Sequence, residues 1–445
     1  MSDFPSSKYE RSKIFAKTGF KVGTNYAKHY VKESMGGRRR KKQGQNKQKL
    51  SDLHRQNAQQ IFQEFSKLRG TALKIAQSMS MDQSMMPEEF GEVLAQAQYK
   101  VPPINKALVR TLIDRELGRP PEKLFSEFQS ESMAAASIGQ VHRAKTLEGE
   151  EVVVKIQYPN VRETIDSDLS MAKMVMKRIV GGENIDPYVK EVREKLMEET
   201  DYRHEGQQLN HFNNWLDPQY YVLPEWKEEL SSDRIITMTY VEGKHLDAFL
   251  NEQPDQEQRN HFGQLLWDFF HHQIDQTGPI HADTHPGNFL FREDGRLGIL
   301  DFGCTKSFPE DFFYHYLKLL PVHLRNNDQE LRQLYEELEI YQPNHSNQKR
   351  EEAFFEFSRR FGNTYAEPYR NEYFDFGDPE YRKQVRQLTE NAPMMLEARG
   401  SKHFIYSTRV HLGLYNFLMK LGAHVQTGPS RERVYALLDR KSSAA

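Results

Sequence analysis

The stretch that most constrains this chain runs from Gly278 to Lys306 and reads GPIHADTHPGNFLFREDGRLGILDFGCTK. Asp283 and Asn288 lie five residues apart, and Asp301 follows thirteen residues later, after two apolar segments that flank a Glu-Asp-Gly turn. This pattern predicts a strand, a turn and a second strand. Two acids and an amide at such a hairpin are the groups that hold metal ions and orient a nucleophile in phosphoryl transfer.

The spacing of these residues matches two motifs of kinases. The step from Asp283 to Asn288 is that of the catalytic loop, and Asp301-Phe302-Gly303 corresponds to the metal-binding triplet. Asp-Phe-Gly alone is a common turn tripeptide, and His281 and His285 are four residues apart, a spacing that zinc ligands use. However, His-Pro-Gly-Asn breaks the helix on which that histidine spacing would work. The combination of motifs therefore favours a kinase-type site.

Length and composition indicate a multidomain globular protein. At roughly 150 residues a domain, the 445 residues suggest two to three domains, and 37% hydrophobic residues provide ample core. Cys304 is the single cysteine, which excludes an internal disulfide. The first residues contain no apolar signal segment, and no apolar run approaches the ~20 residues of a membrane span. We expect a cytoplasmic protein.

The charge of the chain is unevenly distributed. Residues 1–50 carry 14 Lys or Arg against 3 Asp or Glu, a balance of +11, whereas the remainder carries 47 against 60, a balance of −13. The first segment includes GGRRRKKQGQNKQK and has little to bury, so we expect a basic flexible arm over 1–50. Such an arm indicates contact with an anionic membrane surface or nucleic acid, or else a solvated tail.

Residues 51–124 are predicted to be helical. An apolar stripe steps by three and four residues, as in an amphipathic helix: Ile61, Phe65, Leu68, Ala72, Ile75 and Met79. A second stripe on the same helix is polar: Lys67, Gly70, Lys74 and Gln77. A polar stripe is usually a solvated face, although Gly70 would allow another backbone to come close. A further helix is expected from Asn105 to Leu117.

From about Phe125 the pattern changes to strands. MAAASIGQVHRAKTLEGEEVVVKIQYP predicts a strand, a turn at Glu148-Gly149-Glu150 and a second strand that leads into Lys155. Lys155 takes the place of the nucleotide-binding lysine of a kinase. Alternatively, a lysine at the end of a valine strand is an edge-strand charge.

A long helical region is expected from about Asp166 to Trp215. Glu199 and Glu205 fall on its apolar stripe, and a buried carboxylate needs a basic partner, for which Lys155 is the candidate. After a further strand, Val241-Glu242-Gly243 reads as the linker where, in a kinase, adenine meets backbone groups. The remainder is mainly helical, with a core helix predicted over Phe404 to Leu421.

These residues together resemble the UbiB-like, or AarF-domain, atypical kinase family. The match covers about Lys67 to Lys306 and includes six ordered motifs: LRGTALKIAQSMS, AAASIGQVHRA, VVVKIQYP, EETDYRHE, HADTHPGN and LDFG. The resemblance implies an α+β, two-lobed protein-kinase-like fold. Its small β-rich N-lobe would span 125–240 and its mainly helical C-lobe 241–445, with the helical extension at 51–124 added. It also implies an ATPase-type activity that serves quinone or other isoprenoid-lipid metabolism.

The resemblance assigns the phosphate-binding part of the site to an alanine-rich loop. Ala134, Ala135, Ala136 and Ser137 resemble the family's replacement for the glycine-rich loop. Alanine avoids positive φ, so this loop cannot wrap phosphates as glycine does. That property fits poor phosphoryl transfer to proteins. Lys155 would contact the α- and β-phosphates.

The resemblance also assigns the acids and the cofactors. Glu199 and Asp201 resemble the family's ExD motif, with Glu205 as a further acid near the lysine. Asp283 would be the catalytic acid, and Asn288 and Asp301 would bind Mg2+. The implied cofactors are ATP or ADP and Mg2+, and the implied partners are a nucleotide and an isoprenoid lipid or anionic membrane surface at the periphery. No nucleic acid is expected, and the oligomeric state is left open.

The chain departs from the family in its extension. The family pattern Lys-x-Gly-Gln is Lys74-Ile75-Ala76-Gln77 here. Lys74 and Gln77 keep their spacing, so this face could still cover the nucleotide site and exclude a protein substrate. The alanine bears on how tightly the extension closes.

Two other functions remain open at this point. Small-molecule phosphotransferases such as aminoglycoside and choline kinases use a similar HxDxHPGN loop, but they lack the 67–140 segment. A nucleotide-gated scaffold would keep the binding groups and not need Asp283.

Overall fold

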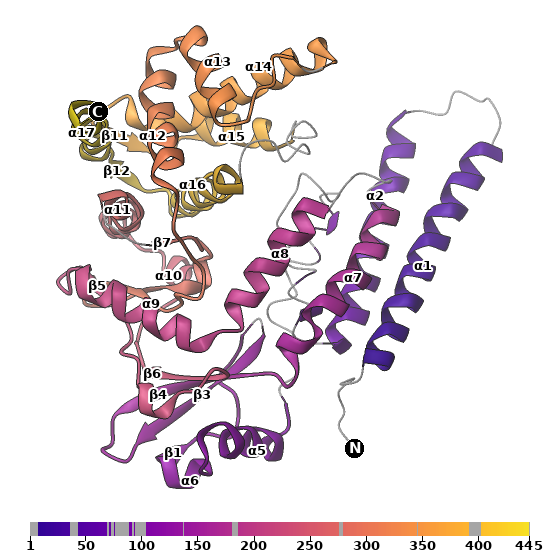
Figure 1. The fold of residues 1–445 in the computed structure, drawn as a ribbon, viewed down its shortest axis with the longest axis vertical. Coiled ribbons are helices and arrows are strands. Elements are labelled where there is room, and N and C mark those ends of the chain that lie inside the picture. Colours follow the sequence, from indigo (N-terminus) through magenta and orange to yellow (C-terminus); the bar gives the residue numbers. More distant parts are fainter. Residues whose placement is uncertain are drawn as a thin grey trace. The chain divides into compact units, whose positions relative to one another are not determined.

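The computed structural model describes residues 8–35, 43–68, 71–72, 75, 89–90, 93, 104–136, 138–179, 186–275, 279–344, 346–390 and 402–444. The chain forms two compact units. The first unit contains Met1–Asn210 and Glu225–Tyr240, and the second contains His211–Pro224 and Val241–Ala445. Both units mix helices with small sheets (Figure 1), so the predicted α+β class is confirmed.

The first unit is built on an antiparallel sheet of five strands in the order β1-β3-β4-β6, with β2 paired to β3. The strands are β1 Phe125–Phe128, β2 Ala134–Ala135, β3 Gly139–Thr146, β4 Glu151–Gln157 and β6 Ile235–Thr239. The predicted hairpin around Gly149 is therefore present. Because β4 lies between β3 and β6, Lys155 pairs with Val141 on one side and Ile236 on the other. The alternative of an edge-strand charge is wrong.

Seven helices are described that begin in the first unit: α1 Lys8–Met35, α2 Gln43–Leu68, α5 Lys106–Leu117, α6 Pro121–Leu124, α7 Val161–Ile179, α8 Asp186–Glu199 and α9 Tyr202–Trp215. The predicted helix at 105–117 is α5, which Asn105 caps through its side chain, 2.7 Å from the Ala107 nitrogen. The long helical region expected from Asp166 to Trp215 is not one helix. It is divided into α7, α8 and α9.

The expectation of a flexible arm over 1–50 is wrong for residues 8–35, which form α1, and for residues 43–50, which begin α2. Figure 1 shows α1, α2 and α7 side by side, and they share one apolar core. Phe15 and Val22 of α1 are buried in that core together with Phe65 of α2 and Leu169 of α7. The α1 helix was missed because its apolar positions are sparse among lysines. Residues 36–42, which hold the densest basic run, lie outside the described residues.

The second unit is mainly helical. Its helices are α10 Leu246–Asn251, α11 Gln256–His272, α12 Glu310–Arg325, α13 Asp328–Glu337, α14 Gln348–Ala366, α15 Pro379–Glu390, α16 Lys402–Leu421 and α17 Gly428–Ala444. The core helix predicted over 404–421 is α16, where Tyr415 and Leu418 are fully buried. Among the described residues, no helix combines the length and the apolar character that crossing a membrane requires.

Short strands of the second unit position the predicted catalytic stretch. One sheet has the order β5-β9-β8, from Tyr221–Val222, Leu297–Ile299 and Phe289–Phe291. A second sheet pairs β7 Ile280–His281 with β10 Thr305–Lys306, and a third pairs β11 Tyr373–Asp375 with β12 His424–Gln426. The strand–turn–strand predicted for 289–299 is the β8–β9 hairpin.

Candidate functional site

In the first unit, Lys155 forms an ion pair with Glu205. The Lys155 Nζ lies 2.9 Å from Oε1 and 3.1 Å from Oε2 of Glu205. The side chains are 13% and 4% exposed, so both charges are largely removed from water. The ammonium also lies 4.9 Å from the ring centroid of Tyr202, within cation–π range. The sequence predicted that a carboxylate on the apolar helical stripe pairs with Lys155, and the structure shows that Glu205 does so.

The alternation of side chains along β4 explains why Lys155 points toward Glu205. Val152, Val154 and Ile156 are buried on one face of the strand, and successive side chains alternate between faces. Lys155 therefore projects from the other face. Glu205 belongs to α9, on the same stripe as the fully buried Tyr202.

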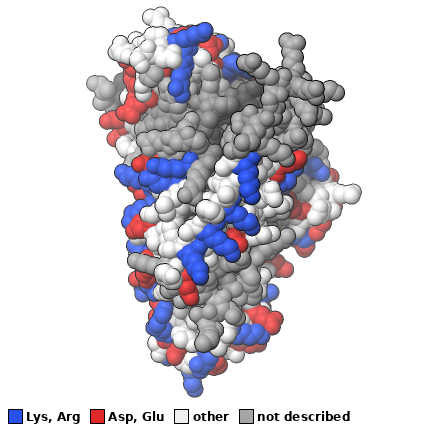
Figure 2. Space-filling model, turned by 90° about the vertical axis from the view of Figure 1, so that its right-hand side faces the viewer, with Lys and Arg blue, Asp and Glu red and all other residues white. Residues whose placement is uncertain are grey.

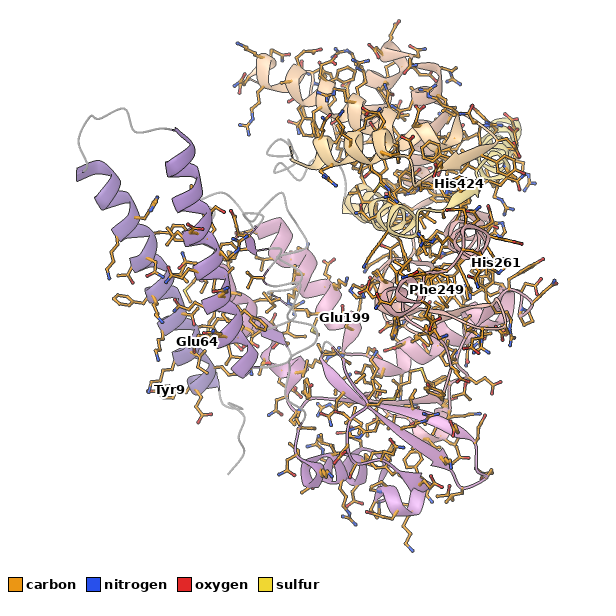
Figure 3. All side chains as sticks on the ribbon, turned by 180° about the vertical axis from the view of Figure 1, so that it is seen from behind. Tyr9, Glu64, Glu199, Phe249, His261 and His424 are labelled. Carbon is orange, nitrogen blue, oxygen red and sulfur yellow. The ribbon has the colours of Figure 1, made fainter. Side chains whose placement is uncertain are left out.

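The two residues of the ExD pattern lie where one helix ends and the next begins. Glu199 is the last residue of α8 and is partly exposed (Figure 3). The Oδ1 of Asp201 accepts a hydrogen bond of 3.0 Å from the His204 nitrogen, as an N-cap does. Asp201 thus helps to begin α9, the helix that carries Glu205.

The alanine loop forms a tight connection into β3. Ala134 pairs with Val141 and Ala135 with Gln140, and the Ala136 nitrogen donates a 2.9 Å hydrogen bond to the Gly139 carbonyl. None of these three alanines has a positive φ, in agreement with the conformational argument from the sequence. A Cβ at Gly139 would lie 2.2 Å from the Ile156 carbonyl oxygen, so only glycine fits there. Ser137, Lys74 and Gln77 lie outside the described residues.

In the second unit, His281 organises the loop that carries Asp283. His281 is 1% exposed, and its Nε2 donates to the Asp301 carbonyl at 2.8 Å. Its Nδ1 accepts a long hydrogen bond of 3.4 Å from the Asp283 nitrogen. With both ring nitrogens engaged by backbone, His281 has a positioning role. No group of three or more possible metal-binding His, Cys, Asp or Glu side chains occurs in the part of the chain that the structure describes.

Backbone hydrogen bonds bring Asn288 and the segment before Asp301 together. The Leu300 nitrogen donates to the Asn288 carbonyl at 2.9 Å. The Oδ1 of Asp301 accepts from the Gly303 nitrogen at 2.9 Å, and that of Asp283 from the His285 nitrogen at 3.1 Å. The three predicted residues of the catalytic stretch therefore belong to one hydrogen-bonded assembly.

The donor set of this assembly fits magnesium. Carboxylate and amide oxygens are the protein ligands that Mg2+ prefers. The Nδ2 of Asn288 is buried without a hydrogen-bond partner among the described residues. The Nδ2 is thus not used to hold the fold, and the amide oxygen of Asn288, like the carboxylate of Asp301, is of the right chemistry for a hard cation.

The linker residue Val241 is 8% exposed. Within the described residues, neither its N–H nor its C=O takes part in a hydrogen bond. The N–H and the C=O of Val241 are therefore available to pair with a ligand or with water. This observation supports the expectation that Val241 contacts a nucleotide base.

Comparison with known proteins identifies the class. Residues 96–335 match the family described as the ABC1 atypical kinase-like domain. The chain belongs to this family, and the resemblance to UbiB-like kinases is confirmed. It is 33% identical over 326 residues to the Saccharomyces cerevisiae protein named "Atypical kinase COQ8, mitochondrial", with 72% of this chain and 63% of that protein covered.

Other relatives extend the match. The Dictyostelium discoideum "Probable serine/threonine-protein kinase abkA" is 28% identical over 362 residues, with 77% of this chain and 64% of the relative covered. The solved structure of Rv3197 with erythromycin, from Mycobacterium tuberculosis, has a TM-score of 0.61 and 28% identity. The superposition covers 87% of this chain and 98% of the Rv3197 chain. The chain spans slightly less than two thirds of the length of these two curated relatives.

Proposed function

We propose that this chain is an ATP-dependent atypical kinase or ATPase that binds Mg-ATP and supports isoprenoid-lipid or quinone metabolism. The observation that carries the proposal is the assembly of Asp283, Asn288 and Asp301 around the backbone contacts of His281 and Leu300. Kinases use an acid, an amide and a second acid in this order for phosphoryl transfer. The family membership supports the same class of chemistry.

Each residue has a proposed role. Asn288 and Asp301 would hold magnesium, which supplies positive charge to neutralise the β- and γ-phosphates. Lys155, oriented by its ion pair with Glu205, would bind the α- and β-phosphates, with the alanine loop alongside. Asp283 would orient water or an acceptor hydroxyl for in-line attack.

The magnesium assignment is tested by replacing Asp301 with asparagine. A ligand at one hundred times its Kd stabilises a folded protein by about 2.7 kcal/mol, so Mg-ATP should raise the melting temperature of the wild type clearly. Asp301→Asn should abolish that rise, as should EDTA. Asp311→Asn, which changes an exposed acid on α12, is the matched control and should keep it. An unchanged Mg-ATP shift in Asp301→Asn rules out the assignment.

A companion variant separates turnover from binding. Asp283→Asn should retain the Mg-ATP shift and lose ATP hydrolysis, because Asp283 acts on the nucleophile. If Asp283→Asn also supports growth of a lipid-deficient strain as the wild type does, the scaffold function replaces the enzyme function.

The helical extension at 51–124 is proposed to exclude protein substrates through Lys74 and Gln77. Replacing both residues with alanine should increase autophosphorylation, measured as phosphate incorporated from labelled ATP. The same low incorporation as in the wild type would discard this role.

We further propose that the chain attaches peripherally to an anionic membrane surface through one face of α1. Tyr9 and Phe20 are 79% and 72% exposed. They lie eleven residues apart, which at 3.6 residues per turn places them on the same face. The opposite face buries Phe15 and Val22 in the core of the first unit.

Lysines lie to one side of the two aromatic residues on α1: at about 100° per residue, Lys13 and Lys17 fall within about 80° of Tyr9, and Lys21 and Lys28 at about 100–120°. The exposed lysines of α1 are Lys13, Lys17, Lys21 and Lys28. No acidic partner is found for any of the four among the described residues. Figure 2 shows Lys and Arg side chains interspersed with Asp and Glu on the face that it views. Exposed aromatic side chains with lysines along one flank suit an anionic lipid surface, at ~1 kcal/mol per basic residue.

A further inference from the structure

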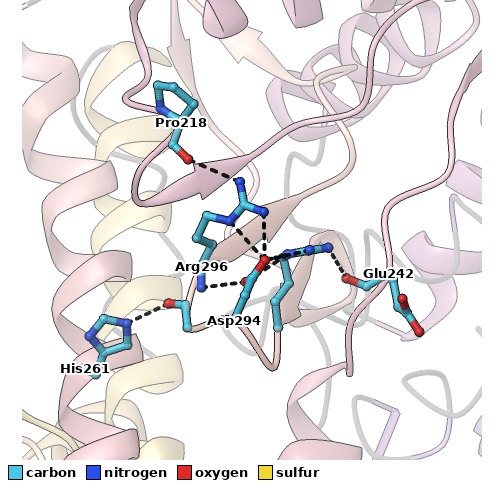
Figure 4. A network of polar contacts seen from close by, with 7 residues as sticks. Pro218, Glu242, His261, Asp294 and Arg296 are labelled. Carbon is cyan, nitrogen blue, oxygen red and sulfur yellow. Dashed lines mark hydrogen bonds and ion pairs between the residues drawn. The ribbon is translucent and has the colours of Figure 1, made fainter.

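Asp294 is the centre of a polar cluster at the β8–β9 turn, in the second unit (Figure 4). Its Oδ2 accepts from Arg292 Nη2 and from Arg296 Nη2, each at 2.8 Å, and its Oδ1 accepts from the Arg296 nitrogen at 3.0 Å. Gly295 has a φ of 79°, which permits the tight turn. The two guanidinium groups hold the pKa of Asp294 well below its usual range. The carboxylate therefore stays charged and fixes both arginines.

Both arginines also donate hydrogen bonds to backbone carbonyls outside the hairpin. Arg292 Nη1 donates to the Glu242 carbonyl at 2.6 Å, and Arg296 Nη1 donates to the Pro218 carbonyl at 3.3 Å. On α11, His261 Nε2 donates to the Gly295 carbonyl at 2.6 Å (Figure 4). The turn is thus anchored on several sides, and one anchor is the linker.

The linker is held to β8 by backbone contacts as well. The Lys244 nitrogen donates to the Phe291 carbonyl at 2.9 Å, and the Phe291 nitrogen donates to the Lys244 carbonyl at 2.7 Å. At Gly243 a Cβ would lie 2.8 Å from the Leu290 Cβ, so the linker backbone approaches the strand closely. Glu242 and Lys244 are therefore both fixed. The peptide groups of Val241, one residue earlier, have no partner in the described chain.

We propose that the Arg292–Asp294–Arg296 cluster positions the linker so that the N–H and C=O of Val241 are presented to the adenine base. Adenine offers a ring-nitrogen acceptor beside an amino donor, which one N–H and one C=O can pair with. Arg292 is a positioning residue because it acts through the Glu242 carbonyl and not on the nucleotide. This inference rests on the proposed function, and it concerns recognition of the base, not of the phosphates.

The test compares a ligand that has a base with one that has none. The Kd values of Mg-ATP and of Mg-tripolyphosphate are measured by calorimetry for the wild type, Asp294→Asn and Arg292→Lys. We expect Mg-ATP to bind about fivefold to tenfold more weakly to both variants, the effect of one misplaced hydrogen bond. Tripolyphosphate affinity should stay within about twofold, because it does not use the linker. If the cluster only supported the fold, the variants would change the Kd values of the two ligands by the same factor.

A matched control is available on α13. Glu330→Gln removes an exposed acid that also binds an arginine side chain, Arg325, but has no contact with the linker. It should leave both Kd values unchanged. Arg292→Lys keeps a positive charge next to Asp294 and serves as the decisive variant if Asp294→Asn does not fold.

The outcomes separate the two proposals. If the wild type binds neither ligand, the proposed function fails. If the wild type binds Mg-ATP and the variants bind it equally well, the positioning role is overturned and the proposed function stands. Equal weakening of Mg-ATP and tripolyphosphate would likewise overturn it, since the cluster would then support the fold alone.

Discussion

Lys155 and Glu205 show how one residue's environment depends on another fifty positions away. Both side chains are largely buried, and their ion pair is held by hydrogen bonds of 2.9 and 3.1 Å. In such surroundings the net stabilisation from the pair is small, because both charges lose their hydration. Removing one partner is different, because it leaves the other charge buried and uncompensated.

We therefore predict that Lys155→Met lowers the free energy of unfolding by about 3–5 kcal/mol. Adding Glu205→Gln to Lys155→Met should recover part of this loss, because the buried charge is then gone. Urea-induced unfolding of the single and double variants measures both effects. Lys145→Met, which breaks an exposed pair with Glu127, is the control and should cost less than about 1 kcal/mol. A double variant no more stable than Lys155→Met would contradict the prediction.

The buried histidine His271 predicts acid sensitivity. Its Nδ1 donates to the Trp267 carbonyl at 2.7 Å, and its Nε2 accepts from the Tyr369 hydroxyl at 2.6 Å, which requires the neutral ring. Burial, the largest cause, lowers its pKa from 6.5 to about 3, and the neighbours His411, His272 and Arg433 act in the same direction. The unfolded chain thus binds this proton more readily, so the stabilisation is complete above pH 6.5 and is lost as the pH falls from there towards 3.

The measurement is the free energy of unfolding between pH 4 and 7. A single histidine of this kind contributes a slope of up to about 1.4 kcal/mol per pH unit. His271→Gln should reduce the slope by about that amount, whereas His424→Gln, which removes a half-exposed histidine on β12 (Figure 3), should not. Equal slopes for His271→Gln and the wild type would discard this account.

At the scale of elements, α1 is attached to the first unit by a buried polar contact as well as by its apolar face. Arg11 Nε donates to Asp168 Oδ1 of α7 at 2.9 Å, and its Nη1 donates to the Leu68 carbonyl at 2.8 Å. The two side chains are 2% and 0% exposed. Leu68 belongs to α2, so one guanidinium connects three helices.

Arg11→Met is predicted to loosen α1 and to destabilise the first unit by about 3–5 kcal/mol, because the buried Asp168 carboxyl would lose its guanidinium partner. Hydrogen exchange of the α1 amides should become faster, and Arg11→Met/Asp168→Leu should be more protected than the single variant. Lys13→Ala, on the exposed side of α1, is the control and should leave exchange unchanged. Unaltered protection of α1 in Arg11→Met would show that the apolar face alone holds the helix.

At the scale of the whole molecule, the structure shows where part of the basic charge of residues 1–50 lies. Part of the positive charge of residues 1–50 lies on an ordered helix with exposed tyrosine and phenylalanine. This arrangement differs from a free basic tail, because apolar and electrostatic contacts would act on the same surface. Membrane attachment would then depend on α1 and not only on residues 38–49.

We predict that changing Lys13, Lys17, Lys21 and Lys28 to glutamine reduces flotation with phosphatidylserine vesicles. At ~1 kcal/mol per residue, each change should weaken binding by about fivefold. A control variant with glutamine at four exposed lysines elsewhere, Lys123, Lys349, Lys383 and Lys420, should float like the wild type. Deleting residues 1–50 should abolish flotation. Equal flotation of the α1 variant and the wild type would reject this face as the membrane contact.

The sequence by itself determined the family, the order of the motifs and the residues of the catalytic stretch. These features are local: Asp283, Asn288 and Asp301 lie within one strand–turn–strand unit, and their spacing carries the chemistry. Strand alternation and apolar stripes likewise predicted the β3–β4 hairpin, α5 and α16, since helical and strand periods are visible in a short window.

Only the tertiary structure decided which distant groups meet. It showed that Lys155, a candidate partner from the sequence, pairs with Glu205, docked α1 on α2 and α7 through Arg11, and joined Asp294 to the linker through Arg292. None of these contacts leaves a pattern at fixed spacing, because each joins segments separated by tens of residues. They depend on burial and packing, which make a charged partner necessary without stating in the sequence where that partner lies.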